Sequence, residues 1–513
     1  MPAPRSNPVS SATELFFRFG PESRRTDGFP LVWLNGGIMA DTGSEKSDYL
    51  FQNQFRYPVY AAMIHMRPLL LVHDEKQIFQ YYECLEQIKT DMSILNSYVD
   101  PFLSLSFADP LFLPCHMDTQ PFELSWTPHL RKQLNTPGVV IPHAADGICL
   151  NQISPTVVTI LQRLYKFMAM EGFNLDVDLS EYLRMGHNAL FWHHKDTYID
   201  LLASRSDKTT IPAHIPSAVI RSDRLKTLTW EQMSFIFNSQ TNIPGTDTFF
   251  IKSNIDAAGE VAASIRKDNF RLKIAAIRKD LQDKIRLMGR KDAPIKIIIQ
   301  PYIQRYDTGS QPSSIGITYN IFGDHDIRRV AVIGHVYEDP GHQTFIGSYA
   351  SKHHTHEVLT RIGEDKIFNL MRLFARKGYR GPVNLDAVRD RKNNYVFIYD
   401  CNPRLGGSFP GIALERALTA QGHCIQSVLT LGYRGRFVFP DLPAKLEELA
   451  GLGLLYTRHQ PRGLCLIPSF VRPNSYDFAL INTPFNQLQE ILASGVLDNL
   501  SDKNQKDLKG VYL

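Results

Sequence analysis

The sequence predicts a mixed fold of helices and strands, with an open α/β layer first, an acidic β-hairpin farther along and a small C-terminal module. Short apolar strands alternate with helix-like stretches from about residue 29 to residue 149, which is typical of an α/β layer. Farther along, two hydrophobic segments at 383–386 and 395–407 carry acidic residues. From about Arg434 the chain changes character, and short apolar segments follow.

Composition narrows the class of protein. The 513 residues are enough for about three or four domains. The formal net charge of +4 argues against a nucleic-acid protein defined by a basic surface. The six cysteines form no CxxC pair, which fits reduced thiols in the cytoplasm and offers no zinc site. No apolar run approaches the roughly 20 residues that span a bilayer, and the Pro/Ser-rich residues 1–8 predict a disordered start, within an N-terminal segment 1–28, instead of a signal peptide.

The first region is expected to hold strands at 31–34 and 69–72 and a helix over 75–88. Apolar residues at helical spacing predict a connecting helix over 154–171. A glycine pair after the first strand allows either an anion-binding turn or an ordinary tight turn, and the sequence leaves both open.

The middle of the chain shows helical and strand-like stretches in turn. The expected elements are a helix at 194–203, an extended segment at 211–216, a helix at 231–237, a strand at 248–252, a helix at 270–288 and a strand at 295–300. The many charges of 270–288 are expected to form a solvated helix face.

Two of these strands lead into segments suited to a nucleotide. Lys252 ends the first, and a loop of small and polar residues that includes Gly259 follows it, so backbone N–H groups and the lysine could hold phosphate. The second runs through Gln300 into a linker, where Ile303 could pack on an adenine and Asp307 could accept hydrogen bonds from a ribose. Taken alone, Lys252 could equally be a surface lysine before a loop, and the second strand could be an edge strand that runs into a loop.

Residues 383–402 predict a β-hairpin that brings two acids together. A polar turn sequence lies at 391–394, and centring the turn there places Asp386 opposite or nearly opposite Asp400. Cross-strand neighbours have Cβ atoms roughly 5 Å apart, so the carboxylates repel unless a divalent cation lies between them. Asn402 projects from the same face and adds a neutral oxygen of the kind that Mg²⁺ prefers. Arg404 offers a planar fork to a phosphate or carboxylate.

The remaining segments carry weaker signals. Strands are expected at 316–322 and 329–336, helices at 357–377 and 410–431, and strands of a C-terminal module at 451–456 and 463–468. Residues 345–351 could form a mobile substrate loop. The cluster of His353, His354 and His356 beside Glu357 could bind a transition metal, bind substrate or lie solvated in a polar loop.

The order of lysine loop, apolar strand with linker and acidic hairpin with Asn-Pro-Arg resembles the ATP-grasp superfamily, over about residues 190–435. The resemblance implies two α+β lobes that grip ATP. It implies ATP and Mg²⁺ as cofactors. The residues that match the family's nucleotide contacts are Lys252, Gly259, Gln300, Ile303 and Asp307; those that match its metal ligands are Asp386, Asp400 and Asn402; and Arg404 matches the arginine at the transferring phosphate.

The resemblance also implies a division of the chain. It predicts a pre-ATP-grasp α/β domain over 29–180, an ATP-grasp domain over 181–435 with its lid at about 205–300, and a small module over 436–513. The stretch "NPRLGGSFPG" and the short C-terminal module resemble the pheganomycin-type peptide ligases.

Three departures from the family pattern stand out. Asp400 replaces a more usual glutamate, and Glu260 and Val261 stand where a further glycine is common. The family's second phosphate lysine has candidates in Lys195, Lys208 and Lys226, and the sequence does not choose among them.

The implied reaction is ATP-dependent ligation of a small carboxylate, such as an amino acid or short peptide, to an amine through an acyl phosphate. Lys252 and Arg404 would stabilise the charge that grows on the transferring phosphate. A phosphotransferase with a hydroxyl acceptor and a non-catalytic nucleotide-binding protein are the alternatives. The sequence leaves the oligomeric state open, while dimers are common in families of this kind.

Overall fold

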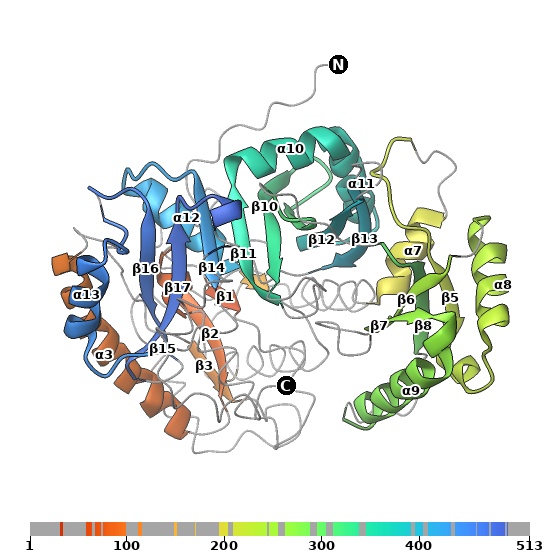
Figure 1. The fold of residues 1–513 in the computed structure, drawn as a ribbon, viewed down its shortest axis with the longest axis horizontal. Coiled ribbons are helices and arrows are strands. Elements are labelled where there is room, and N and C mark those ends of the chain that lie inside the picture. Colours follow the sequence, from red (N-terminus) through yellow and green to blue (C-terminus); the bar gives the residue numbers. More distant parts are fainter. Residues whose placement is uncertain are drawn as a thin grey trace.

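The fold was analysed in a computed structural model. It describes residues 31–33, 58–63, 67–72, 75–98, 111–114, 148–150 and 170, and then 194–490 with gaps at 204–208, 244–245, 255–261, 288–294, 304–310, 338–344, 391–395, 404–408, 432–436, 458, 471–472 and 488–489. Figure 1 shows three β-sheets, each with helices against it.

The first sheet is parallel and belongs to the N-terminal region. Its strands are β1 (Leu31–Trp33), β2 (Arg67–Val72), β3 (Leu111–Pro114) and β4 (Ile148–Leu150), in the order β3-β2-β1-β4. Helices α2 (Pro58–Met63) and α3 (Glu75–Tyr98) precede and follow β2. Parallel pairing with helical crossovers confirms the expected α/β layer.

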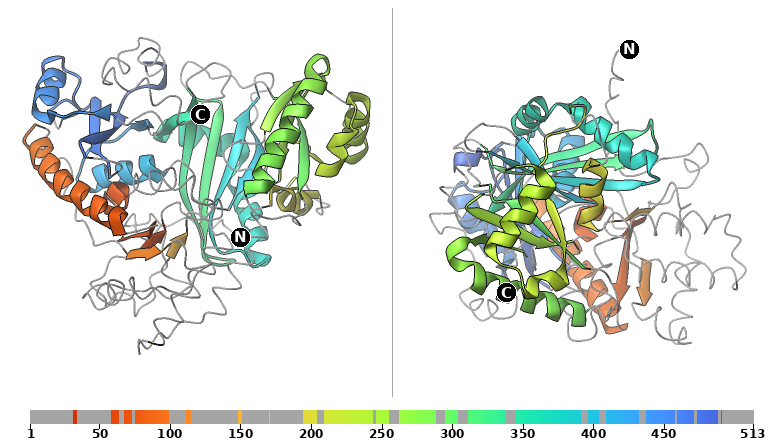
Figure 2. Two further views of the ribbon diagram at one scale, coloured as in Figure 1. Left: turned by 90° about the horizontal axis from the view of Figure 1, so that it is seen from below. Right: turned by 90° about the vertical axis from the view of Figure 1, so that its right-hand side faces the viewer.

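The second sheet forms a lobe of its own at one end of the molecule (Figures 1 and 2). Its antiparallel strands are β5 (Ala218–Arg221), β6 (Thr248–Ser253), β7 (Ala262–Arg266) and β8 (Lys296–Pro301), in the order β5-β8-β6-β7. Helices α8 (Trp230–Thr241) and α9 (Phe270–Leu287) bury apolar faces against it, with Phe237 and Phe249 fully enclosed. We call this unit, residues 218–301, the lid lobe.

The third sheet is the largest and lies in the middle of the molecule (Figure 1). Its strands run in the order β13-β12-β9-β10-β11-β14-β17-β15, with β16 also paired to β17. They are β9 (Ser314–Ile321), β10 (Ile327–Tyr337), β11 (Phe345–Ser351), β12 (Gly381–Arg389), β13 (Val396–Asn402), β14 (Ser427–Leu431), β15 (Phe437–Val438), β16 (Gly463–Pro468) and β17 (Ser475–Ile481). We call this sheet the central sheet.

Helices cover one face of the central sheet beside the hairpin. They are α10 (Lys352–Ile362) and α11 (Glu364–Arg376), whereas a single helix was expected over 357–377. That expectation was wrong because Gly363 adopts a φ of 83°, a left-handed conformation that ends one helix and admits the next.

Two further expectations for this region were wrong. Residues 345–351 form strand β11 inside the sheet, hydrogen-bonded on both sides, and do not form a mobile loop. The helix expected over 410–431 is α12 (Phe409–Ala420) followed by strand β14, because Gly422 with a φ of 85° turns the chain back into the sheet.

The C-terminal strands extend the central sheet. Strand β17 pairs with β14, and helix α13 (Leu442–Gly451) lies against α3 from the N-terminal region. A strand was expected at 451–456, but α13 occupies its start and only Leu455 forms an isolated bridge. The division of the chain at residue 435 stays a prediction, since the sheet and its core continue across it.

Buried polar contacts also join the two ends of the chain. The hydroxyl of Tyr476 on β17 donates to Asp91 on α3 at 2.8 Å, and the hydroxyl of Tyr60 on α2 donates to Asp477 at 3.2 Å. Burial raises the pKa of Asp91 above its ordinary value, although hydrogen bonds from Gln87 and Tyr476 oppose it. These contacts lock α2 and α3 against the C-terminal strands.

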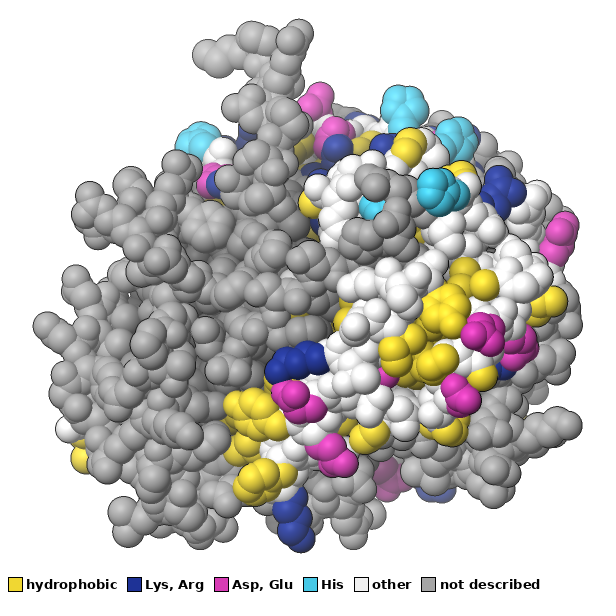
Figure 3. Space-filling view, turned by 90° about the vertical axis from the view of Figure 1, so that its left-hand side faces the viewer, with side chains coloured by type: hydrophobic (Ala, Val, Ile, Leu, Met, Phe, Trp, Pro, Cys, Tyr) yellow, Lys and Arg dark blue, Asp and Glu magenta, His cyan; other side chains and the backbone are white. Residues whose placement is uncertain are grey.

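The described surface agrees with the composition. On the face in Figure 3, acidic and basic side chains are interspersed and form no broad basic patch among the described residues. Within the same part of the chain, no helix is both long and apolar enough to span a bilayer. The helix expected over 154–171 and the glycine pair after β1 lie outside the described residues.

Candidate active site

The acidic hairpin has the predicted register. Strands β12 and β13 pair antiparallel, and Asp386 and Asp400 are direct cross-strand partners. A β-bulge lies between Asp386 and Ala387, next to the acidic pair. Bulges often re-aim side chains beside functional sites. The turn sequence 391–394 falls outside the described residues, but the strands alone establish the pairing.

Neutral amides hold the first carboxylate. Asn384 donates from Nδ2 to one oxygen of Asp386 at 2.6 Å, and Asn402 donates from Nδ2 to the other at 2.7 Å. The hydroxyl of Thr318 donates to Oδ1 of Asn384 at 3.0 Å, which fixes the orientation of that amide. The amides thus fix the position of Asp386 from both sides without neutralising its charge.

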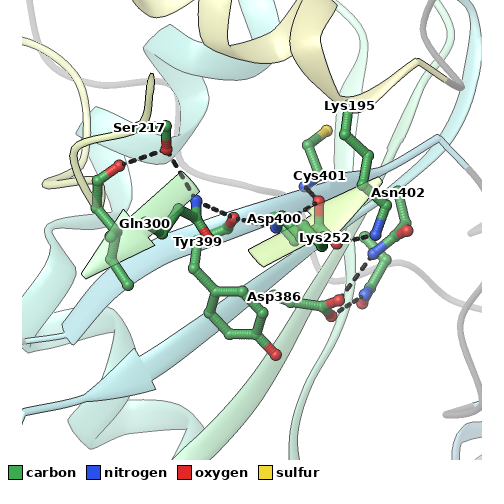
Figure 4. A network of polar contacts seen from close by, with 11 residues as sticks. Lys195, Ser217, Lys252, Gln300, Asp386, Tyr399, Asp400, Cys401 and Asn402 are labelled. Carbon is green, nitrogen blue, oxygen red and sulfur yellow. Dashed lines mark hydrogen bonds and ion pairs between the residues drawn. The ribbon is translucent and has the colours of Figure 1, made fainter. Parts of the chain in front are cut away.

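Lysines hold the second carboxylate, as Figure 4 shows. Asp400 is buried, and Lys195 contacts its Oδ2 while Lys252 lies 3.4 Å from its Oδ1. The backbone N–H of Cys401 also donates to Oδ1 at 3.0 Å. Burial by itself raises the pKa of Asp400, but the two ammonium groups outweigh it and the pKa lies below its ordinary value. The group is therefore an anion in a largely dehydrated position.

Lys252 reaches this carboxylate from the lid lobe. It lies on β6, is only 3% exposed, and donates to the backbone oxygen of Tyr399 at 2.9 Å. Burial lowers its pKa to about 8, although the charge of Asp400 opposes the shift. Near neutral pH this lysine is charged, and a modest change in its surroundings changes that state.

Gln300 meets the same stretch of β13 from the next lid strand. Its Nε2 donates to Ser217 Oγ at 2.9 Å and to the Tyr399 backbone oxygen at 3.1 Å. Ile303, two residues past the end of β8, is half-buried. Two lid strands therefore converge on Tyr399 and Asp400, beside the acidic pair.

The second cation comes from helix α7 (Lys195–Ala203), whose first residue is Lys195. Asn254, which follows β6, accepts from the Lys195 backbone N–H at 2.9 Å and donates from its side chain to Asp196 at 2.9 Å. Lys296 on β8 pairs with Asp196 at 2.6 Å. These contacts attach the start of α7 to the lid strands and aim Lys195 at Asp400.

The structure thus distinguishes among the three lysine candidates that the sequence left open. Lys195 lies in the site, Lys226 is exposed at the end of a short 3-10 helix in the lid lobe, and Lys208 lies outside the described residues. The sequence signal that could have identified Lys195 is its place at a helix start, directly before Asp196.

A lid sheet carrying Lys252 and Gln300, a helix start carrying Lys195 and an antiparallel hairpin carrying two aspartates meet at one point. The chain has the ATP-grasp fold. The fold class expected from the sequence is therefore confirmed at the level of architecture, with a parallel α/β layer ahead of the two lobes.

Comparisons with known proteins find matches among solved structures alone. No protein-family model matches the chain, and no curated protein matches it. Among solved structures, the ATP-grasp chain is similar to an L-amino acid ligase from Bacillus licheniformis, at 9% identity and a TM-score of 0.45, over 92% of this chain and 97% of that one. An N5-carboxyaminoimidazole ribonucleotide synthetase from Thermus thermophilus has 10% identity and a TM-score of 0.43, covering 92% and 99%.

A phosphoribosylglycinamide synthetase from Anaerococcus prevotii is also similar, at 10% identity and a TM-score of 0.40, over 91% of this chain and 98% of that chain. All three TM-scores lie below 0.5. The function of this chain must therefore be argued from the contacts of its own residues.

The donors at the hairpin fit a divalent cation. Asp386, Asp400 and Asn402 supply two carboxylates and one amide, the hard oxygen donors that Mg²⁺ takes along with water and phosphate oxygens. Two anions in direct register need positive compensation, and Lys195 and Lys252 supply part of it at Asp400. The described residues include no group of three or more His, Cys, Asp or Glu side chains arranged as metal ligands.

Three predicted site residues lie outside the described part of the chain. They are Gly259 in the lysine loop, Asp307 in the linker and Arg404 after the hairpin. Their roles stay predictions.

The histidine cluster lies on a helix and not in a loop, with His353 and His356 exposed as expected and His354 buried. His353, His354 and His356 all lie in the first turns of α10, and His354 is 1% exposed, with Nδ1 3.4 Å from Oε1 of Gln311. Burial and the nearby Arg389 guanidinium lower its pKa to about 4, so it is neutral. Arg389 also pairs with Glu357 at 2.9 Å, which ties α10 to strand β12 of the central sheet.

Proposed function

We propose that this protein is an ATP-grasp ligase that joins a small carboxylate to an amine at the expense of ATP, and that it belongs to the ATP-grasp superfamily. One observation carries the proposal: Lys195 and Lys252, from two different elements, both contact Asp400, the cross-strand partner of Asp386. Two cations beside two metal-binding anions are what a nucleotide triphosphate with its Mg²⁺ requires.

The lysines would exchange partners when ATP binds. Asp400 now neutralises them, and phosphate oxygens would take over that role while Mg²⁺ takes the carboxylate. Asp386, Asp400 and Asn402 would hold the ion, which when bound supplies charge to the phosphates and orients them. Gly259 would support a phosphate through its backbone, Ile303 would pack on the adenine, and Asp307 would accept from the ribose hydroxyls.

The chemistry then depends on positioned charge. A carboxylate oxygen of the substrate attacks the γ-phosphorus of ATP, and the bond to ADP breaks with its electron pair going to ADP. Lys252, Lys195 and Arg404 would stabilise the charge on the transferring group, and the lid lobe would exclude the water that destroys the acyl phosphate. An amine then displaces phosphate, and the amide forms.

The decisive experiment is an ADP-release screen with Mg²⁺ and single amino acids or short peptides as carboxylates and amines. Asp400→Asn and Asn402→Ala are each expected to lower ADP release by at least about 100-fold. Asp223→Asn, which changes an exposed lid aspartate paired with Arg221, is the matched control and should retain full activity.

Full turnover in both site variants would refute the assignment. A phosphorylated product that forms without any amine would show a phosphotransferase on the same scaffold. Failure to bind Mg-ATP at millimolar nucleotide would leave a non-catalytic protein.

The finer assignments belong to the same proposal. Peptide-type substrates, a homodimeric state and the division into units at 29–180, 181–435 and 436–513 rest on the sequence resemblance, and a cytoplasmic location rests on the scattered cysteines. Sedimentation and limited proteolysis would test the dimer and the division directly.

A further inference from the structure

A polar row crosses the central sheet beside the acidic hairpin. Ser314 Oγ lies 3.2 Å from Nδ1 of His335 and 3.3 Å from the hydroxyl of Tyr337. His335 is the cross-strand partner of Ser348, and Ser348 is the partner of Thr430 on β14. Direct partners project from one face, so these side chains form a continuous line across strands β9, β10, β11 and β14.

This row shares its face with Asp386. On β9, Gly316 is the direct partner of Asp386, and Ser314 lies two residues before it on the same face. The intervening positions point the other way: Tyr319 packs edge-on against Phe368 of α11, with ring centroids 5.3 Å apart. Helix α11 therefore covers the opposite face, and the row lies on the side of the metal-binding residues.

Glycine at position 316 leaves room for the His335 imidazole over the residue that pairs with Asp386. A Cβ atom at this position would lie 2.9 Å from Nε2 of His335 and 3.2 Å from Oδ1 of Asn384. Nε2 thus lies over the residue paired with Asp386, and Asn384 is the residue that donates to Asp386. Any side chain here would push the histidine away.

Helix α12 covers the end of the row at Thr430. A Cβ at Gly411 would lie 3.4 Å from Oγ1 of Thr430, so the first turn of α12 packs over this strand. Ser348 and Thr430 are buried, whereas His335 and Tyr337 are half-buried. Ser314 is buried as well, so the row is covered at its β14 end under α12 and is partly exposed only at His335 and Tyr337.

We propose that His335 is the catalytic base that takes a proton from the acceptor amine, and that the acceptor binds along this row. The inference rests on the proposed function, because it names the acid–base group of that reaction. It also commits the acceptor to a class: a protonated amine, which cannot attack an acyl phosphate until it loses a proton.

The proton balance is complete with one histidine. The acceptor ammonium gives one proton to Nε2, and its nitrogen attacks the acyl carbon. The bond from that carbon to the phosphate oxygen breaks, with the electron pair going to phosphate. Of the two protons left on nitrogen, one stays on the amide and one leaves with the phosphate as hydrogenphosphate.

Ser314 and Tyr337 act as positioning residues. A proton on Nδ1 donated to Ser314 Oγ makes Nε2 the basic nitrogen, which is the one over Gly316. Two titratable groups lie near this pair on the described strands: Tyr337 on β10, whose hydroxyl lies 3.3 Å from Ser314 Oγ, and Asp386 on β12, the cross-strand partner of Gly316.

The test compares two acceptors in His335→Gln. Glutamine keeps a hydrogen-bonding side chain beside Ser314 but cannot take the proton. Glycylglycine is the first probe, since its α-amino group has a pKa of about 8 and is mostly protonated at pH 7. Hydroxylamine is the second, since it is unprotonated there and needs no base. Each of the twenty amino acids is supplied in turn as carboxylate, with Mg-ATP.

At pH 7, His335→Gln is expected to lose about 100-fold or more of the peptide product while forming hydroxamate at the wild-type rate. Peptide formation should recover toward pH 9, where the acceptor is already neutral. His325→Gln, an exposed histidine in the turn between β9 and β10, is the matched control and should behave as wild type with both probes.

Equal loss with both acceptors, or equal retention with both, would overturn the proposal. A wild-type protein that forms neither product and releases no ADP with any carboxylate would instead refute the proposed function, and the role of His335 would fall with it. The melting temperature of His335→Gln, measured beside that of the wild type, shows that the variant is folded.

Discussion

Asp386 and Asp400 are cross-strand partners, yet the protein treats them in opposite ways. Two neutral amides from the hairpin itself hold Asp386, which is half-buried. Two lysines from other elements hold Asp400, which is buried. The first carboxylate is prepared for a ligand from outside, while the second also fastens the lid lobe and α7 to the central sheet.

This difference predicts unequal effects of the same substitution. Asp400→Asn leaves two lysines without their anion, one of them fully enclosed, and is expected to lower the free energy of unfolding by about 3 kcal/mol. Asp386→Asn keeps an acceptor oxygen for the amides that hold this residue, and we expect a loss of about 1 kcal/mol. Urea unfolding followed by intrinsic fluorescence measures both. Equal losses would contradict the assignment of a fastening role to Asp400.

The sequence predicted the pairing of Asp386 within the hairpin, but it did not predict the Lys195 contact of Asp400. Strand alternation and a short polar turn determine register within a hairpin, so the acidic pair and Asn402 follow from local spacing. Lys195 lies 205 residues from Asp400, and only the docking of α7 on the lid strands brings them together. No pattern within either segment contains that contact.

Contacts with distant segments also determine two other elements that the sequence did not predict. Residues 345–351 carry Gly, Ser and Tyr, which resemble a loop by composition, but neighbours on both sides satisfy their backbone as β11. His354 lies in a run of polar residues, yet the helix turns it inward against Gln311. Tertiary partners decided these elements, whereas lid strand β8, with its run of buried isoleucines, was predictable from the sequence alone.

Asn254→Ala tests the contribution of Lys195 to the comparison, because it removes a contact that holds the start of α7 against the lid strands. The Asn254 side chain bonds Asp196 at 2.9 Å and accepts from the Lys296 backbone N–H at 3.0 Å, in a site that is 1% exposed. Leaving those groups unpaired is expected to cost about 2 kcal/mol in the free energy of unfolding and to weaken Mg-ATP binding. Asn238→Ala, on the exposed face of α8, is the matched control. Unchanged nucleotide affinity in Asn254→Ala would show that Lys195 does not depend on this contact.

The smallest predicted effect concerns the charge of Lys252. Its pKa of about 8 lies below the ordinary lysine value because of burial, so the fraction that is protonated falls as the pH rises through 8. If ATP binds only the protonated form, the dissociation constant rises about tenfold between pH 7 and pH 9. Lys252→Arg stays charged over this range, and its binding should be flat with pH. Calorimetry at constant Mg²⁺ measures the dissociation constant of both proteins against pH. A flat profile in the wild type would contradict the prediction, because it would mean that the charge of Asp400 outweighs burial and keeps Lys252 protonated up to pH 9.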